Sequence, residues 1–309
     1  MSPALTRADP GGAAYLDLQR LARTQGRPTA ELLQLYVLEA FLRRLSRSTH
    51  VDRLVLKGGM LLAAFDLRRP TRDVDLLALA CDNDPAAVRA VVVEVGATPD
   101  HDGVAFDVDG AVTEVIRDED LYPGVRVRLT ASLATARVPL SVDVNVGDPV
   151  WPLPARTPIP ALLGGPPVEV LGYPLAMVVA EKLVTAVQRG RANTRWRDFA
   201  DLWMLLGGPP ATDAGRPLPA GRSAGPLADI DVTEAIHAVA SHRQASLEPL
   251  GPALAGMERE AQPRWAAWRK RQSGAAALPE RLGDLIAMID ARSAGWLRTA
   301  GPTVRTSGA

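Results

Sequence analysis

Three aspartates form the part of this sequence best suited to chemistry. Asp73 and Asp75 lie two residues apart in a segment with a strand-like pattern, so both side chains project from the same face. Asp143 lies on the polar face of a later strand, between two valines. A carboxylate in a half-buried strand needs a partner, and carboxylates that share one face repel each other unless a cation lies between them. We therefore expect the three to bind Mg²⁺ or Mn²⁺, with phosphates and waters as the other ligands.

Gly58 and Gly59 separate a short apolar strand from a helix. Glycines let the backbone approach a ligand closely, and the N–H groups at a helix start can contact phosphate. Each signal alone has an ordinary reading: many tight turns contain two glycines, and an Asp-x-Asp pair at a strand start is often solvated. Together they favour phosphoryl or nucleotidyl transfer, in which carboxylate-held metal ions activate a hydroxyl and hold the leaving pyrophosphate.

A lysine and a cluster of arginines in the second half are candidates for binding phosphates. Lys182 lies in an otherwise apolar helix, where the alternative is a surface lysine that extends its amine to water. Arginine suits bidentate phosphate contacts, and four follow this helix in a patch that could bind triphosphate or RNA, or could be a solvated junction: Arg189, Arg191, Arg195 and Arg197. Arg197 could equally form an ion pair with Asp198 or Asp201.

A second basic cluster lies beside two tryptophans. Trp265 and Trp268 could stack on RNA bases next to basic side chains, or could face inward from a surface helix. The basic residues are Arg264, Arg269, Lys270 and Arg271. For Trp196 and Trp203, which fall on one helical face, core packing is the better interpretation.

The elements that must position these residues follow from apolar spacing. Two helices are expected within 15–47, after a loose lead-in over 1–14, with Thr29 as N-cap of the second helix and Arg43, Arg44 and Arg47 on its exposed face. Strands are expected at 54–56, 74–79, 112–117, 125–133 and 140–146, and helices at 60–65 and 85–95. After a proline-rich extended connection, helices are expected at 174–188, 195–206, 232–241, 263–272 and 280–297.

Composition limits the classes of protein to consider. The 309 residues have zero formal net charge, so any polyanion must be bound by a local basic patch. The single cysteine, Cys81, excludes an internal disulfide and a cysteine-rich zinc site, and fits a cytoplasmic protein as a small core residue. The longest apolar stretch, 175–187, is too short and too charged to cross a bilayer, so we expect no membrane partner.

Several of these segments, in this order, resemble the AbiEii/AbiGii toxin family within the DNA polymerase β-like nucleotidyltransferases. They are Leu56-Lys57-Gly58-Gly59, Arg69-Pro70-Thr71-Arg72-Asp73-Val74-Asp75, Ser141-Val142-Asp143-Val144, Glu181-Lys182 and Arg197-Asp198-Phe199-Ala200-Asp201-Leu202. The resemblance extends over about residues 30 to 295. The sequence departs from many relatives at Met60, where they carry a hydroxyl residue that could touch a phosphate.

The resemblance implies an α+β fold with a mixed sheet, plus a mainly helical C-terminal domain. We expect a lead-in and helix over 1–28, the nucleotidyltransferase core over 29–150, a helical domain completing the active site over 151–300, and a disordered tail over 301–309.

The resemblance also implies a toxin of a toxin–antitoxin or phage-defence pair that transfers a nucleotide, often from CTP or UTP, to the 3′ end of tRNA. The cognate antitoxin would be AbiEi-like or of another type. Asp73 and Asp75 would be metal ligands, Lys182 and Asp198 catalytic, and Thr71 a target for inactivating phosphorylation. Residues that would bind the nucleotide or the RNA backbone are Lys57, Gly58, Gly59, Thr71, Arg189 and Arg197.

Two alternatives remain at this point. One is the same chemistry on a small molecule or a protein. The other is a catalytically inactive relative that only binds RNA, although binding alone would not require clustered carboxylates.

Overall fold

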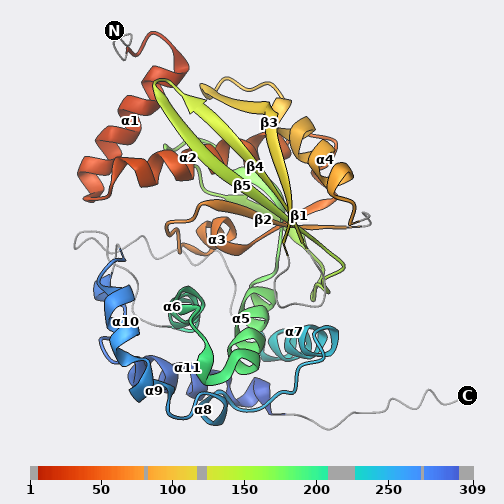
Figure 1. Cartoon of the computed structure of the whole chain (residues 1–309), viewed down its shortest axis with the longest axis vertical. Helices are drawn as coiled ribbons and strands as arrows, with labels where there is room; N and C mark the ends of the chain where they lie inside the picture. The colour runs from red at the N-terminus through yellow and green to blue at the C-terminus, as the bar shows by residue number, and fades with distance from the viewer. Residues whose placement is uncertain (1–5, 80–82, 117–123, 208–226, 273–274, 299–309) are drawn as a thin grey trace, which may run out of the picture. The chain divides into compact units, whose positions relative to one another are not determined.

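The computed structural model describes residues 6–79, 83–116, 124–207, 227–272 and 275–298 (Figure 1). These residues form two compact units, the first up to Pro174 and the second from Leu175 onward, and each is described by itself. The sequence placed this change at residue 150, whereas the sheet of the first unit continues to residue 172. Cys81 and the tail 301–309 lie outside the described residues.

The first unit is built on a seven-stranded mixed sheet with the order β3-β4-β5-β2-β1-β7-β6. Strand β2 pairs antiparallel with β1 and parallel with β5, and β1 pairs parallel with β7. The strands are β1 (Leu54–Lys57), β2 (Asp73–Ala78), β3 (Val104–Ile116), β4 (Gly124–Leu133), β5 (Ala136–Val146), β6 (Ala155–Ile159) and β7 (Val168–Gly172). The mixed sheet and its helices confirm the α+β class.

Four helices pack against this sheet: α1 (Pro10–Gln25), α2 (Thr29–Leu45), the short α3 (Gly58–Leu61) and α4 (Pro85–Ala97). Helix α1 begins earlier than predicted, because the Asp9 side chain accepts a hydrogen bond from the Gly12 N–H and caps it. The prediction of Thr29 as N-cap of α2 is wrong: the cap is Pro28, and Thr29 is the first helical residue. Asp84 is the N-cap of α4, as we predicted from Pro85 at the first helical position.

Arg44 is not on an exposed face of α2 but is buried. Its guanidinium donates to both carboxylate oxygens of Asp102, at 2.8 and 3.2 Å, and lies 4.9 Å from the ring centroid of Phe106. The periodicity of α2 could not show this, because the opposite charge comes from a segment after α4. A buried arginine is tolerated when a carboxylate satisfies it in this way.

The proline-rich segment after residue 149 contains two strands that the sequence did not indicate. Strand β6 contains Pro158, which has no N–H to donate, and it lies at the edge of the sheet, where proline is tolerated. Strand β7 alternates between buried and more exposed residues and pairs with β1, so it extends the sheet beside the glycine pair.

The second unit is helical, as predicted, with two additional short helices. The helices are α5 (Leu175–Arg189), α6 (Trp196–Leu205), α7 (Asp229–His242), α8 (Leu250–Ala253), α9 (Met257–Glu260), α10 (Gln262–Arg269) and α11 (Leu282–Leu297). Among the described helices, none is long and apolar enough to span a bilayer.

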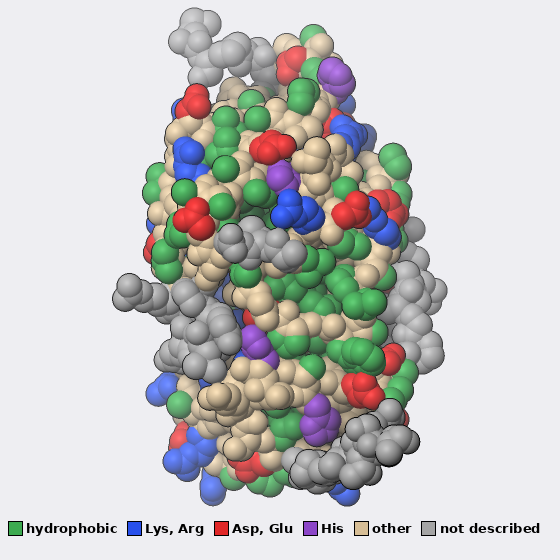
Figure 2. Space-filling model, turned by 90° about the vertical axis from the view of Figure 1, so that its right-hand side faces the viewer, with side chains coloured by type: hydrophobic (Ala, Val, Ile, Leu, Met, Phe, Trp, Pro, Cys, Tyr) green, Lys and Arg blue, Asp and Glu red, His purple; other side chains and the backbone are tan. Residues whose placement is uncertain are grey.

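Trp265 faces inward rather than toward a ligand. It is fully buried, packs against Trp196 with ring centroids 6.3 Å apart, and stacks on Trp268 at 5.3 Å. The indole N–H of Trp203 donates to the Ala277 carbonyl. On the face of the molecule in Figure 2, acidic and basic side chains are interspersed, in keeping with the zero net charge.

Candidate active site

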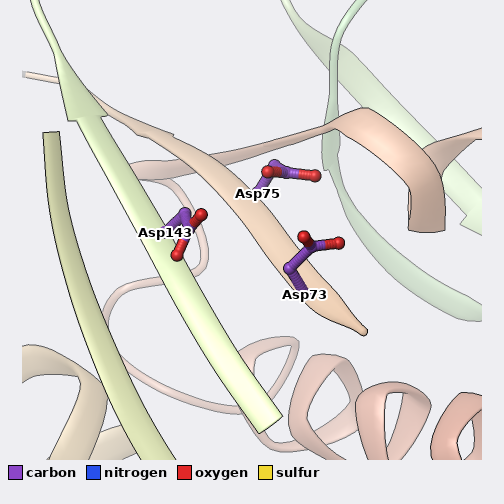
Figure 3. Close-up of side chains that lie close together, drawn as sticks. All are labelled: Asp73, Asp75 and Asp143. Atoms are coloured by element: carbon purple, nitrogen blue, oxygen red, sulfur yellow. The ribbon is translucent and has the colours of Figure 1, made fainter. Parts of the chain in front are cut away.

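Strand pairing brings the three aspartates together. Asp75 and Asp143 are direct neighbours in the parallel pair β2–β5, and Asp73 precedes Asp75 by two residues on the same face. Figure 3 shows Asp73 and Asp75 projecting from β2 beside Asp143 on β5. One carboxylate oxygen from each lies within 4.8 Å of the others. The structure therefore places all three predicted carboxylates in one cluster.

Burial and neighbouring charges together perturb Asp75. Burial, followed by the negative charges of Asp73 and Asp143, raises the pKa of Asp75 to about 7. The charge of Lys57 and a hydrogen bond from the Gly59 N–H act in the opposite direction. A site where carboxylates oppose each other's ionisation has affinity for a cation, and an all-oxygen donor set fits Mg²⁺ or Mn²⁺.

The glycine pair makes room for this cluster. Gly58 has a φ of 66°, in the left-handed region that glycine adopts readily, and a Cβ on it would lie 1.8 Å from Asp75 Oδ2. A Cβ on Gly59 would lie 2.7 Å from the Thr71 hydroxyl. A side chain at either position would therefore collide with a residue of the site, which explains why both positions are glycine. The contact of these glycines with phosphates stays a prediction.

Thr71 supports Asp73 from within the loop that precedes β2. Its side chain is buried, and its hydroxyl donates to Asp73 Oδ1 at 2.5 Å. Met60, where the resemblance led us to expect a hydroxyl residue, is buried in the core. Thr71 is therefore a hydroxyl that directly touches a predicted metal ligand.

Lys57 lies opposite Asp75 in the β1–β2 pair. Its amine is 2.8 Å from Asp148 Oδ2 and 5.6 Å from the ring centroid of Tyr173. Sequence reasoning placed Lys57 at the site but missed Asp148, which follows the end of β5. The side chain is thus held close to Asp75 by a second carboxylate and an aromatic face.

Arg126 is a second residue at this site that sequence reasoning missed. Its guanidinium contacts Asp143 through two parallel hydrogen bonds, Nε to Oδ1 at 2.8 Å and Nη2 to Oδ2 at 2.6 Å. The two residues are direct partners in the antiparallel pair β4–β5. The signal was the short turn after Leu133: counting outward from a two-residue turn pairs position 126 with position 143.

In the second unit, Lys182 joins two acidic side chains of α6. Its amine lies 2.6 Å from Asp198 Oδ1 and 2.8 Å from Asp201 Oδ2, and Arg195 Nε donates to Asp198 Oδ2 at 2.7 Å. Lys182 is therefore not a lysine that extends into solvent. Arg195, rather than Arg197, is the arginine paired with Asp198.

The charges of this second cluster stabilise one another. Burial acts to lower the pKa of Lys182, but Asp201 and Asp198 outweigh it and the pKa is raised. Burial acts to raise the pKa of Asp198, but Lys182 and Arg195 outweigh it and the pKa is lowered. The ion pairs thus favour the charged forms of Lys182 and Asp198.

The expected arginine patch is partly engaged in ion pairs within the second unit. Arg191 lies 3.6 Å from Glu260, and Arg195 contacts Asp198. Arg197 is exposed, and Arg189 ends α5. The structure therefore leaves the role of Arg189 and Arg197 in binding phosphate as a prediction.

We expect Asp75→Asn to stabilise the metal-free protein at alkaline pH. Because the pKa of Asp75 is higher in the folded than in the unfolded chain, its contribution to stability is full at low pH and is lost as pH rises through about 7. Asparagine stays neutral, so the variant should gain about 1–4 kcal/mol at pH 8.5 and less at pH 5.

Urea unfolding in EDTA, compared with Asp109→Asn on exposed β3, measures this difference. Millimolar Mg²⁺ should then stabilise the wild type and not Asp75→Asn. A wild type that is more stable than the variant at pH 8.5 in EDTA would contradict the assignment of a crowded, cation-requiring carboxylate.

Comparisons with known proteins identify the family of this chain. Residues 40–287 match the family described as nucleotidyl transferase AbiEii toxin of type IV toxin–antitoxin systems. Two Helicobacter pylori structures are similar at 14% identity: a candidate nucleotidyltransferase (87% of this chain, 98% of that chain, TM-score 0.45) and JHP933 (86% and 94%, TM-score 0.46). No curated protein sequence matches the chain significantly.

Proposed function

Because the chain belongs to the AbiEii family of nucleotidyltransferase toxins, we propose that it is a cytoplasmic toxin that transfers a nucleoside monophosphate from a triphosphate to the 3′ end of tRNA. CTP and UTP are the proposed donors, and blocked translation is the proposed consequence, in a cell's defence against phage. The family implies an antitoxin partner. We propose one that is AbiEi-like or of another type.

The observation that carries this proposal is the aspartate cluster on β2 and β5. A divalent cation bound there would supply positive charge to activate the attacking hydroxyl and to stabilise the leaving pyrophosphate. Asp73 and Asp75 would hold it, and Asp143 would be the third ligand or would orient the site. Gly58 leaves the space that Asp75 needs for this.

Further roles are proposed for the cationic residues. Lys57 would offset charge on the nucleotide phosphates from beside Asp75. Lys182 has three N–H donors, of which Asp198 and Asp201 take two, so one donor direction suits a phosphate oxygen. Asp198 would position Lys182, while Arg189 and Arg197 would contact phosphates of the triphosphate or of RNA.

Thr71 is a proposed site of inactivation by phosphorylation. A phosphate on this hydroxyl would remove its hydrogen bond to Asp73 and place up to two negative charges beside a predicted metal ligand. Since Thr71 is buried, the loop that carries it would have to open to a kinase.

A second candidate function is the same transfer to a small molecule or a protein. The partial neutralisation of the arginine patch by Glu260 and Asp198 favours it, because less positive charge remains for a polyanionic acceptor. The same assay separates the two candidates.

The test incubates the purified protein with Mg²⁺, total tRNA and each α-³²P-labelled nucleoside triphosphate in turn. We expect label on tRNA, most strongly from CTP or UTP, and none when EDTA is present. Nuclease digestion from the 3′ end should release the label first. Protein that labels no tRNA with any triphosphate would refute the tRNA proposal, and labelled small molecules or proteins in a cell extract would support the second candidate.

A further inference from the structure

Asp143 is held by an arginine and also belongs to the aspartate cluster. Arg126 contacts both of its carboxylate oxygens, and the pairing of β4 with β5 fixes this contact from the backbone. The Arg126 side chain is 31% exposed and that of Asp143 10%, so the pair lies where the site meets solvent. A fork of two parallel hydrogen bonds of this kind is among the stronger ion pairs in proteins.

The same carboxylate faces Asp75 across the β2–β5 pair, and one of its oxygens lies within 4.8 Å of oxygens of Asp73 and Asp75. A cation among the three aspartates and the guanidinium of Arg126 therefore attract the same negative charge. Arg126 reduces the negative charge of the cluster by one and restrains the orientation of its third carboxylate.

We propose that Arg126 is a built-in counter-cation that occupies Asp143 and weakens the affinity of the aspartate cluster for divalent cations. The inference rests on the proposed function in one respect, because it takes this cluster as the metal site. Arg126 acts through Asp143 and is a positioning residue. It keeps the Asp143 carboxylate paired when the cation is absent. A cation can therefore bind Asp143 only in competition with Arg126.

The test is a titration of the full chain with Mn²⁺ alone, followed by calorimetry and by electron paramagnetic resonance of free Mn²⁺. Arg126→Gln removes the charge and the fork, so the dissociation constant should fall at least about fivefold, as expected for a unit charge removed at close range. Arg126→Lys keeps a charge but, as a compact point charge, cannot match both oxygens, and should give an intermediate value, at least about twofold tighter than wild type.

Arg128→Gln is the matched control. Arg128 lies two residues further along β4, on the same face, and pairs with Glu114 at 2.6 Å rather than with Asp143. This variant loses the same charge and should leave the Mn²⁺ dissociation constant within about twofold, because an exposed charge is well screened. Adding Asp143→Asn to Arg126→Gln should abolish the gain, since the released carboxylate is its source.

Thermal unfolding separates folding from affinity, and if Arg126→Gln does not fold, Arg126→Lys carries the test. Mn²⁺ binding that is unchanged or weaker in the folded Arg126 variants, or no Mn²⁺ binding by wild type and variants, would overturn the inference. The tRNA-labelling assay fails or succeeds independently. Labelling without the predicted order of Mn²⁺ affinities refutes only this inference, and the predicted order without labelling refutes only the tRNA reaction.

Discussion

Replacing Asp73 by asparagine should reduce nucleotidyl transfer by at least about a thousandfold, the scale seen when a group that stabilises transition-state charge is removed. Asp73 is one of two carboxylates on β2 that face the same cation site, and Thr71 already orients it. Asparagine keeps the shape and the hydrogen bond from Thr71 but loses the negative charge. The fold should therefore persist while the chemistry is lost.

Initial rates of label transfer at saturating triphosphate measure this effect, with Asp109→Asn as a control of equal chemical change on exposed β3. Circular dichroism and a melting curve should show a native Asp73→Asn protein. Retention of a tenth or more of the wild-type rate would remove Asp73 from the proposed metal site, and an unfolded variant would make it a structural residue.

Replacing Lys182 by methionine should destabilise the second unit by about 3–5 kcal/mol, because it removes the central cation of a buried cluster of ion pairs. Asp198 keeps Arg195, whereas Asp201, which is 4% exposed, loses the ammonium that lies 2.8 Å from its Oδ2. Gln188→Met, on an exposed position of the same helix, should change stability by less than about 0.5 kcal/mol.

Adding Asp201→Asn to Lys182→Met should recover part of the loss. Urea unfolding of the wild type, of Lys182→Met, of Asp201→Asn and of the double variant measures the coupling. If Lys182→Met is as stable as wild type, the amine is not the structural centre of this cluster. If Lys182→Met with Asp201→Asn folds but binds triphosphate as tightly as wild type, the proposed phosphate contact of Lys182 is wrong.

Sequence reasoning located the carboxylate cluster because the relevant signals are local. The period-two alternation around Asp73, Asp75 and Asp143 gives the face of each strand, and only the pairing of β2 with β5 was needed to bring them together. The family resemblance is confirmed by the match over residues 40–287.

The features that were missed depend on partners distant in the chain. Arg44 looked exposed because its partner, Asp102, lies beyond α4. Strand β6 was not predicted because it contains Pro158, and proline is tolerated in a strand only at the edge of a sheet. Which strand lies at the edge depends on the order of strands in the folded sheet. Arg126 is the exception, because the two-residue turn after Leu133 sets a hairpin register that pairs position 126 with Asp143.

The parallel pairing of β2 with β5 also sets when the site can exist during synthesis. Asp73 and Asp75 leave the ribosome first, while Asp143 follows only after α4 and strands β3 and β4. A parallel pair needs this crossover to close, and because closing so long a loop is entropically costly, we expect β2 and β5 to pair late in folding. A nascent chain that ends before β5 therefore carries two of the three carboxylates and no Arg126–Asp143 pair. For a toxin proposed to act on tRNA, the aspartate cluster would be complete only after the ribosome has translated most of the first unit.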